Sequence, residues 1–420
     1  MLGAGADARA DARYAPARPP LTIDVHTHIM PESLPDLRAR YGCDGWVSLQ
    51  KLPCGKRARM MRDDGTAFRE VEDSLWSLPR RLADCDARGV RVHVLSTVPV
   101  LFSYWAPDDA AADFAALLND HMARAVAHAP NRLVGLGTLP MQSPKLAVAE
   151  LRRCMGPLGL AGVQIGTHVN DKPLSDAELF PVFEAAAELG AAVFVHPCAC
   201  ARAALREARA RPGAPTNPPL PPPRARAGDM MGSHLMRDYF LPWLVGMPAE
   251  TTLAMCSLTL GGVLERLPAL RVLFAHGGGS FAATLGRIEH GWAVRPDLTR
   301  VHARTSPAAL AAQGRLWVDS LVHEPHALAA AVRTFGARRV CLGSDYPFPL
   351  GEFTAESGGT DYAPGALLDE MARGAAAWGG GWAPGGDIRE VRAKRTRAAP
   401  VAPDNCNPNK PHNPRAPHDP

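Results

Sequence analysis

The sequence predicts an α/β protein built on a (β/α)₈ TIM-like barrel, with a small lobe inserted after the first strand. Three observations support this prediction. Short stretches rich in valine, leucine and isoleucine recur along the chain, and helix-like stretches separate several of them. Their number, eight, favours a closed barrel over an open, doubly wound sheet. Polar residues follow the apolar runs at their carboxyl ends, and in a parallel barrel these ends meet at one mouth.

The eight predicted strands are apolar on both faces, as expected of strands that helices cover. They occupy residues 21–29, 90–98, 132–140, 160–169, 191–197, 271–279, 314–322 and 339–347. Helices are predicted before the second to fifth strands, at residues 77–89, 108–130, 144–159 and 175–190. Several helical stretches end in glycine just before the next strand, which is a usual helix stop.

Long connections divide the chain further. Residues 30–76 contain two possible short strands, GWVSLQ and TAFREVE, so we expect a small lobe over the barrel mouth. Residues 198–228 are rich in proline and arginine, and we expect a low-complexity insertion that cannot form a core. The barrel is then expected to span residues 21–372, between a disordered leader at 1–20 and a disordered tail at 373–420.

Composition excludes several classes of function. The 420 residues are 46% hydrophobic and carry a formal net charge of +4. Residues 201–227 alone hold six arginines and one glutamate, a net +5, so the predicted barrel is not basic and we expect no nucleic-acid surface. The nine cysteines form no CxxC pair, which is typical of reduced thiols in the cytosol. No apolar run reaches the roughly 18 residues of a membrane span.

Four residues at predicted strand ends form a candidate metal site. His26 and His28 are two apart on the first strand, so their side chains share a face. Taken alone, this pair is more often solvent-facing, His196 more often a core histidine, and Asp345 more often a helix cap. Together they place three imidazoles and one carboxylate at one mouth. That set favours Zn²⁺, with Mn²⁺, Fe²⁺ or Co²⁺ as alternatives.

His276 follows the sixth strand and precedes three glycines, which would let a substrate approach the backbone closely. A histidine beside a metal site can act as general acid or base near neutral pH, and we prefer this role to that of a fifth ligand or a structural residue. The fourth strand lacks the lysine or glutamate that a bridged two-metal site would need, so we expect one ion per subunit. His168 on that strand is expected to support the site without binding the ion.

Two arginines are candidates for binding an anionic substrate, because a guanidinium pairs with a carboxylate through two hydrogen bonds. Arg69 lies in the lobe and Arg287 follows the sixth strand. Composition alone does not select these two from the other arginines, for which solvated surface is the default interpretation.

Seven motifs resemble, in order, those of the 2-amino-3-carboxymuconate-6-semialdehyde decarboxylase family of the amidohydrolase superfamily. They are DVHTHIMPE, STVPVLFSYWA, VGLGTLPMQ, GVQIGTHVN, LPWLVGMPAETT, FAHGGGSF and LGSDYPFPLGE. The resemblance implies one Zn²⁺ per subunit, with His276 as the acid or base. It also implies that Arg69 binds a substrate carboxylate, that Arg287 is donated across a homodimer interface, and that Trp243 lies near the site. The implied ligands are His26, His28, His196 and Asp345.

The implied reaction is the Zn-dependent loss of CO₂ from 2-amino-3-carboxymuconate 6-semialdehyde, giving 2-aminomuconate 6-semialdehyde. This step belongs to tryptophan breakdown by the kynurenine route, where it limits the formation of quinolinate and NAD. The chain departs from the family after His196-Pro197, where Cys198 and the insertion follow, and again in the tail. Two alternatives therefore stay open: another lyase or hydrolase of the superfamily acting on a carboxylated ring or lactone, and an inactive product.

Overall fold

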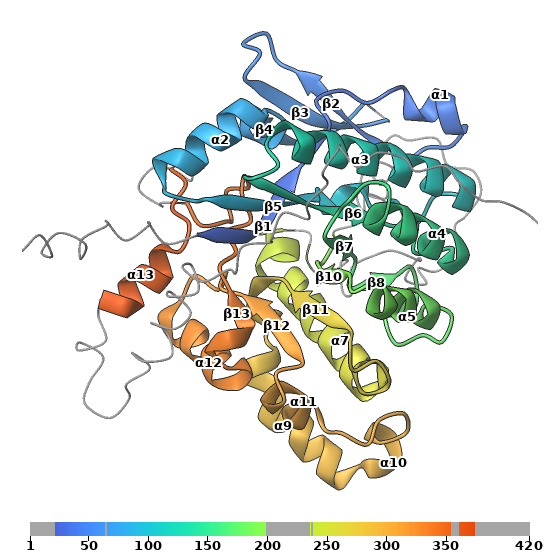
Figure 1. Ribbon diagram of the computed structural model, residues 1–420, viewed down its shortest axis with the longest axis vertical. Coiled ribbons are helices and arrows are strands. Elements are labelled where there is room, and N and C mark those ends of the chain that lie inside the picture. The colour runs from blue at the N-terminus through green and yellow to red at the C-terminus, as the bar shows by residue number, and fades with distance from the viewer. Residues whose placement is uncertain (1–21, 64, 199–235, 237, 354–360, 374–420) are drawn as a thin grey trace, which may run out of the picture.

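The computed structural model describes residues 22–63, 65–198, 236, 238–353 and 361–373 (Figure 1). The expected leader, nearly all of the expected insertion, and the expected tail beyond Arg373 lie outside the described residues. None of the helices within the described ranges combines the length and the apolar character that crossing a membrane requires.

Eight parallel strands form the central sheet, and their spatial order follows their order in the chain. They are β1 (Ile23–Ile29), β5 (Val92–Thr97), β6 (Leu133–Thr138), β7 (Gly162–Ile165), β10 (Ala192–Val195), β11 (Arg271–Phe274), β12 (Leu316–Asp319) and β13 (Val340–Cys341). All eight predicted strands are confirmed, and so is the barrel-like fold class. The first and last strands also meet, because Val25 N donates to Leu342 O over 2.9 Å and Asp345 N donates to His26 O over 2.9 Å.

The predicted strand ends were too long in two places that matter for the site. The fourth strand stops at Ile165, and His168–Val169 (β8) pairs instead with Lys172–Pro173 (β9) in a separate hairpin. The sixth strand stops at Phe274, and His276–Gly278 form a 3₁₀ turn, η5. Both errors have the same cause, since the apolar pattern continues past the point where backbone pairing ends.

Helices surround the sheet (Figure 1). They are α1 (Leu37–Tyr41), α2 (Leu78–Ala87), α3 (Asp108–His128), α4 (Pro144–Met155), α5 (Phe180–Glu188), α7 (Met247–Leu260), α8 (Val263–Arg266), α9 (Phe281–Val294), α10 (Pro296–Thr299), α11 (Pro307–Ala312), α12 (Pro325–Phe335) and α13 (Ala366–Arg373). The helices predicted before the second to fifth strands are confirmed as α2 to α5. Ser77 caps α2 by accepting a hydrogen bond from Arg80 N, which satisfies one free backbone donor of its first turn.

The hydrophobic core has two layers that meet at the strands. Alternate residues such as Val163 and Val193 face outward and pack in the large cluster shared with the helices. A smaller cluster, which includes Leu136, Phe194 and Ala275, forms separately. The ring of Phe194 lies 4.9 Å from the ring of His26, measured between centroids. Apolar packing therefore reaches the histidines of the predicted metal site.

The predicted lobe is a three-stranded antiparallel sheet of β2 (Val47–Lys51), β3 (Arg57–Arg62) and β4 (Ala67–Glu72). The two predicted strands are confirmed, and β3 was missed because its sequence, RARMMR, is half arginine. Only Ala58 and Met60 of β3 are buried, on the face that packs in a cluster with Phe114 of α3. This packing holds the lobe against the barrel (Figure 1).

A buried chain of hydrogen bonds links β1 and β5 to the C-terminal segment. Asp24, which is fully buried, accepts from the Tyr362 hydroxyl over 2.6 Å and also from the Ser344 hydroxyl. His93 Nε2 lies 2.9 Å from the same Tyr362 hydroxyl, and a guanidinium nitrogen of Arg81 lies 3.3 Å from His93 Nδ1. Arg81 can only donate, so His93 donates through Nε2 and Tyr362 donates to Asp24.

We expect this network to make stability depend on pH. Burial and the charge of Arg81 hold the pKa of His93 well below its usual 6.5. Below about pH 6.5 the unfolded chain gains a proton at His93 and the folded chain does not. The free energy of unfolding should therefore fall as the pH is lowered below this value, by up to ~1.4 kcal/mol per pH unit for this residue. Urea unfolding of His93→Gln, with metal chelated, should show a shallower slope between about pH 4.5 and 6.5.

The matched control is His128→Gln, because His128 is exposed at the end of α3. We expect this control to change the slope less than His93→Gln does. Equal slopes for His93→Gln and the wild type would show that His93 is not the buried neutral group.

Candidate metal centre

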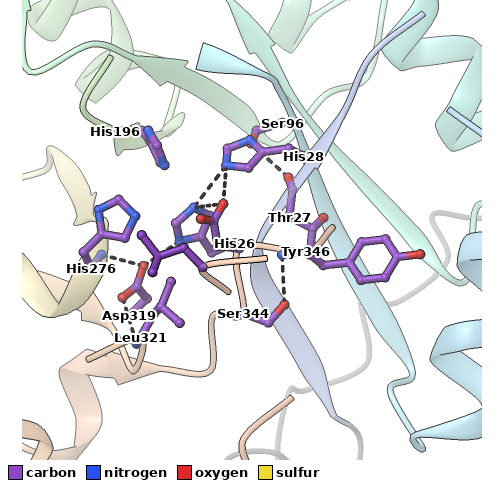
Figure 2. A network of polar contacts seen from close by, with 12 residues as sticks. His26, Thr27, His28, Ser96, His196, His276, Asp319, Leu321, Ser344 and Tyr346 are labelled. Atoms are coloured by element: carbon purple, nitrogen blue, oxygen red, sulfur yellow. Dashed lines mark hydrogen bonds and ion pairs between the residues drawn. The ribbon is translucent and has the colours of Figure 1, made fainter. Parts of the chain in front are cut away.

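The structure brings the four predicted ligands together at the carboxyl ends of the strands. Figure 2 shows the side chains of His26, His28 and His196 gathered there. One side-chain atom from each of His26, His28, His196 and Asp345 lies within 4.8 Å of the corresponding atoms of the other three. His26 Nε2 and His28 Nε2 are 3.2 Å apart. Asp345 Oδ1 lies 3.5 Å from the first of these nitrogens and 3.0 Å from the second. The four residues come from three different strand ends.

Each of the three imidazoles is oriented by an oxygen atom that faces its Nδ1. An acceptor at Nδ1 holds the ring proton there, so the lone pair of Nε2 points into the cluster. His196 Nε2 is buried and has no hydrogen-bond partner among the described residues. The oxygens are Asp319 Oδ2 at 2.8 Å from His26, Thr97 O at 3.1 Å from His28, and Pro197 O at 2.6 Å from His196.

This donor set fits a single divalent cation. Three nitrogen lone pairs and a carboxylate oxygen converge with no proton between them, an arrangement that a positive ion stabilises. In a tetrahedral site with Zn–N distances of about 2.0–2.1 Å, neighbouring ligand atoms are roughly 3.3–3.4 Å apart. The separations of 3.0, 3.2 and 3.5 Å lie around this value. Imidazole with carboxylate suits Zn²⁺ and also other divalent transition metals.

The pKa shifts of three of the four clustered residues agree with this fit. For the fourth, His26, burial opposes the charged form, but the hydrogen bond to Asp319 and the charge of Asp345 raise the pKa above its usual 6.5. Burial, reinforced by the neighbouring histidines, holds the pKa of His196 well below its usual range. Burial also lowers the pKa of His28, although Asp345 opposes the shift. Burial alone would raise the pKa of Asp345, but the adjacent imidazoles of His28 and His26 lower it to about 2. Neutral imidazoles and an ionised carboxylate are the forms that bind metal.

His276 lies beside the four residues and outside their cluster. Its ring centroid is 5.0 Å from that of His196 and 5.3 Å from that of His26. Burial lowers the pKa of His276 to about 4, so its ring is neutral at neutral pH. Its Nδ1 is buried without a hydrogen-bond partner among the described residues. His276 is thus placed as a free base next to the predicted ion.

The glycines after His276 have a packing role that the sequence interpretation missed. Gly277 has φ +62°, and a Cβ there would lie 2.2 Å from Val322 Cγ1. Gly279 has φ +63°, and a Cβ there would lie 2.1 Å from the Pro248 carbonyl oxygen. Neither space nor backbone conformation allows a side chain, so the turn itself requires these glycines.

Arg69 and Trp243 meet on one side of the cluster. The guanidinium carbon of Arg69, on β4, lies 4.9 Å from the ring centroid of Phe348 and 5.4 Å from that of Trp243. Such contacts hold a cation over aromatic faces. Burial lowers the pKa of Arg69, and the charge of Asp345 opposes this shift. Phe348, which sequence reasoning did not select, also lies 5.6 Å from the His28 ring and so links the lobe arginine to the cluster.

Two predicted residues lie elsewhere. Arg287 is exposed on α9, and within the described part of this chain it is not among the residues that contact the cluster. His168 is outside the ligand set, as expected. However, its Nδ1 lies 3.0 Å from Asn170 O and its Nε2 lies 3.2 Å from Glu250. Neither of these partners is one of the four clustered residues, and the expectation that His168 supports a ligand stays a prediction.

Asp319 is the main residue that sequence reasoning missed. It ends β12, is fully buried, and bonds both His26 and the backbone of His276 (Figure 2). A signal was present, since an aspartate closes the apolar run LWVD at the same strand end that supplies the other site residues.

Comparisons with known proteins agree with this fold and site. Residues 23–379 match the family described as Amidohydrolase. The chain is 46% identical over 351 residues to 2-amino-3-carboxymuconate-6-semialdehyde decarboxylase of Dictyostelium discoideum, covering 84% of this chain and 86% of that protein. The Caenorhabditis elegans protein of the same name is 35% identical over 397 residues, covering 83% and 90%.

Solved structures show the same fold at lower identity. The apo form of Metarhizium anisopliae IDCase is similar with a TM-score of 0.64 at 24% identity, covering 90% of this chain and 98% of that one. The 5-carboxyvanillate decarboxylase of Sphingomonas paucimobilis has a TM-score of 0.62 at 22% identity, covering 89% and 96%.

The fold and the cluster at its mouth define an enzyme of the amidohydrolase class. Within that class, the chain belongs to the 2-amino-3-carboxymuconate-6-semialdehyde decarboxylase family, and it is a carboxy-lyase.

Removing one predicted ligand tests the metal centre. We expect His196→Ala to lower the affinity for Zn²⁺ by more than ~100-fold, because it removes a predicted ligand whose Nε2 has no hydrogen-bond partner in the described ranges. The matched control is His168→Ala, which should keep one Zn²⁺ per chain because Glu250 and Asn170 engage its ring. Competition with a chromophoric chelator measures the affinity, and circular dichroism checks the fold. Wild-type affinity in His196→Ala would remove His196 from the ligand set.

Proposed function

We propose that the protein is a Zn²⁺-dependent decarboxylase of 2-amino-3-carboxymuconate 6-semialdehyde. The products are 2-aminomuconate 6-semialdehyde and CO₂, in the cytosol, on the tryptophan and kynurenine route, where the step limits quinolinate and NAD formation. The observation that carries this proposal is the Arg69 cation, held against Phe348 and Trp243 beside a three-histidine, one-aspartate cluster. Relatives that bear this enzyme name share up to 46% of the sequence.

The substrate carries two carboxylates, and we assign one arginine to each. Arg69 is the candidate for the first carboxylate. The aromatic rings fix its guanidinium, and the charge of Asp345 acts on its pKa. Arg287 is the candidate for the second, supplied by another copy of the chain in a homodimer. Its helix, α9, also carries the exposed Val294. Exposed apolar side chains of this size mark protein contact surfaces where they gather.

The reaction breaks the carbon–carbon bond to one carboxylate, releases CO₂ and leaves a proton in its place on carbon. A divalent ion, when bound, supplies a Lewis acid that lowers the pKa of water toward neutrality. His276 is neutral at working pH, so it can accept a proton from water in the site and return it to the carbon. Arg69 holds the substrate so that the departing carboxylate faces the cluster and the retained one does not.

Replacing His276 tests this assignment. We expect His276→Ala to lower kcat by at least ~100-fold, while Zn²⁺ content stays unchanged. The substitution removes a neutral base whose Nδ1 has no hydrogen-bond partner among the described residues. CO₂ release and loss of substrate absorbance are the readouts. The matched control is His128→Ala, an exposed histidine at the end of α3. Full activity of zinc-loaded His276→Ala would contradict the role.

The wild-type measurement separates the competing functions. Zinc-loaded wild type that releases CO₂ only from an aromatic carboxylate such as 2,6-dihydroxybenzoate would favour a different lyase of the family. Water addition to a lactone without CO₂ would favour a hydrolase. Zinc-loaded protein with no turnover of any of these would favour an inactive product.

Mixing two inactive variants tests whether Arg287 acts across a dimer. Arg69→Ala and Arg287→Ala should each lose activity, since each removes one carboxylate partner. In a mixed dimer, one site keeps Arg69 from its own chain and receives Arg287 from the other. Random subunit exchange should therefore restore about a quarter of wild-type activity. No restoration after proven exchange would mean that both arginines serve the same chain.

A further inference from the structure

A single buried carboxylate contacts both halves of the proposed active site. Asp319 Oδ2 lies 2.8 Å from His26 Nδ1 and accepts the backbone N–H of His276 over 2.9 Å (Figure 2). Its Oδ1 accepts the backbone N–H groups of Gly277 over 2.8 Å and Leu321 over 3.1 Å. Asp319 is fully buried and is not one of the four clustered residues. Both carboxylate oxygens already have hydrogen-bond partners, so we infer the role of Asp319 from these partners.

Toward His26, Asp319 determines which nitrogen faces the cluster. The Nδ1 proton is shared with Asp319, so the Nε2 lone pair is free for the ion. A carboxylate in this position fixes the ring plane and makes the imidazole a stronger donor. The other two histidines have neutral carbonyl acceptors at Nδ1, from Thr97 and Pro197. His26 is therefore the ligand that is held by a carboxylate.

Toward His276, Asp319 stabilises a backbone conformation that L-residues avoid. His276 has φ +56° and Gly277 has φ +62°. A non-glycine residue in this region is strained, so it persists only where surrounding contacts hold it. Asp319 accepts the N–H of both residues, one with each oxygen. The carboxylate thus holds the backbone of His276 in the position from which its side chain extends toward the cluster.

The surroundings leave this carboxylate little freedom. Gly343 packs against it, and a Cβ at that position would lie 2.7 Å from the Cβ of Asp319 and 2.9 Å from the Cβ of His26. Contacts this short do not occur between real Cβ atoms, so any larger residue at 343 would push Asp319 and His26 out of place. The two side chains are therefore held by packing as well as by hydrogen bonds.

We propose that Asp319 is a positioning residue that couples the metal ligand His26 to the acid–base residue His276. The Asp319 carboxylate orients the ring of His26 and the backbone of His276, so removing it should displace both residues. This inference rests on the proposed function for the role of His276, and on the metal centre for the role of His26.

The test is Asp319→Asn, which keeps the size of the side chain and replaces one acceptor oxygen by a donor nitrogen. Zn²⁺ affinity, measured by competition with a chelator, should fall about 10–100-fold because the support of His26 weakens. At saturating Zn²⁺, kcat should fall about tenfold or more with KM within twofold, because the displaced His276 affects the chemical step.

A double-mutant cycle separates positioning from general structural damage. In a His276→Ala background, Asp319→Asn should no longer lower kcat further, because its route to the reaction is gone. The loss of Zn²⁺ affinity should persist in that background, because it acts through His26. An equal drop in kcat in both backgrounds would overturn the coupling to His276.

Two further variants serve as controls. Glu150→Gln removes another largely buried carboxylate, on α4, which accepts hydrogen bonds from Asn119 over 2.6 Å and from Arg153 over 2.9 Å. This variant should leave Zn²⁺ affinity and kcat unchanged. If Asp319→Asn does not fold, Gly343→Ala displaces the same carboxylate without altering a polar group and should also weaken Zn²⁺ binding. Wild-type Zn²⁺ affinity in folded Asp319→Asn, or in Gly343→Ala if Asp319→Asn does not fold, would overturn the proposal. Chelator competition needs no substrate, so failure of the proposed reaction would be seen separately.

Discussion

The convergence of three imidazole nitrogens and one carboxylate oxygen is the constraint on which the rest of the site depends. The Nε2 atoms of His26 and His28 are 3.2 Å apart, and Asp345 Oδ1 lies beside them. Without a cation, such a concentration of lone pairs in a buried place is unfavourable. The protein prepares it by bonding each Nδ1 to an oxygen outside the cluster, which removes the alternative of hydrogen bonds between the rings.

The barrel seam carries much of this preparation. β1 supplies two of the clustered histidines, and the chain after β13 supplies Asp345, so their relative placement depends on how the first and last strands meet. Asp24 bonds the backbone N–H groups of His26 and Ser344 at 3.1 Å each. Tyr362 reaches the same carboxylate from the C-terminal segment. A polar network beneath the site therefore joins the ends of the barrel, and the stability of the seam and the geometry of the cluster are linked.

The residues proposed to bind the substrate lie in a different part of the molecule. The lobe brings Arg69 over the mouth, and a π-helix, η4 (Pro242–Gly246), presents Trp243 to it. Single π-helical turns are frequent at functional sites. The arginine is attached to the lobe, the tryptophan to the segment before α7, and Phe348 to the loop after Asp345. The residues proposed to bind the substrate thus come from three segments that are distant in sequence, whereas the four clustered residues lie on, or just after, strands of one sheet.

The eight strands, the four helices before strands two to five and the clustered residues were all predictable from the sequence, because they depend on local patterns. Apolar runs mark buried parallel strands, and polar residues at their ends share one mouth. The turn at His276, the departure of His168 from the fourth strand and the role of Asp319 were not predictable in this way. Each depends on contacts between distant segments: Val322 and Pro248 against the glycine turn, Glu250 against His168, and β12 against β1. Periodicity carries no information on such contacts, because they arise only when the barrel closes.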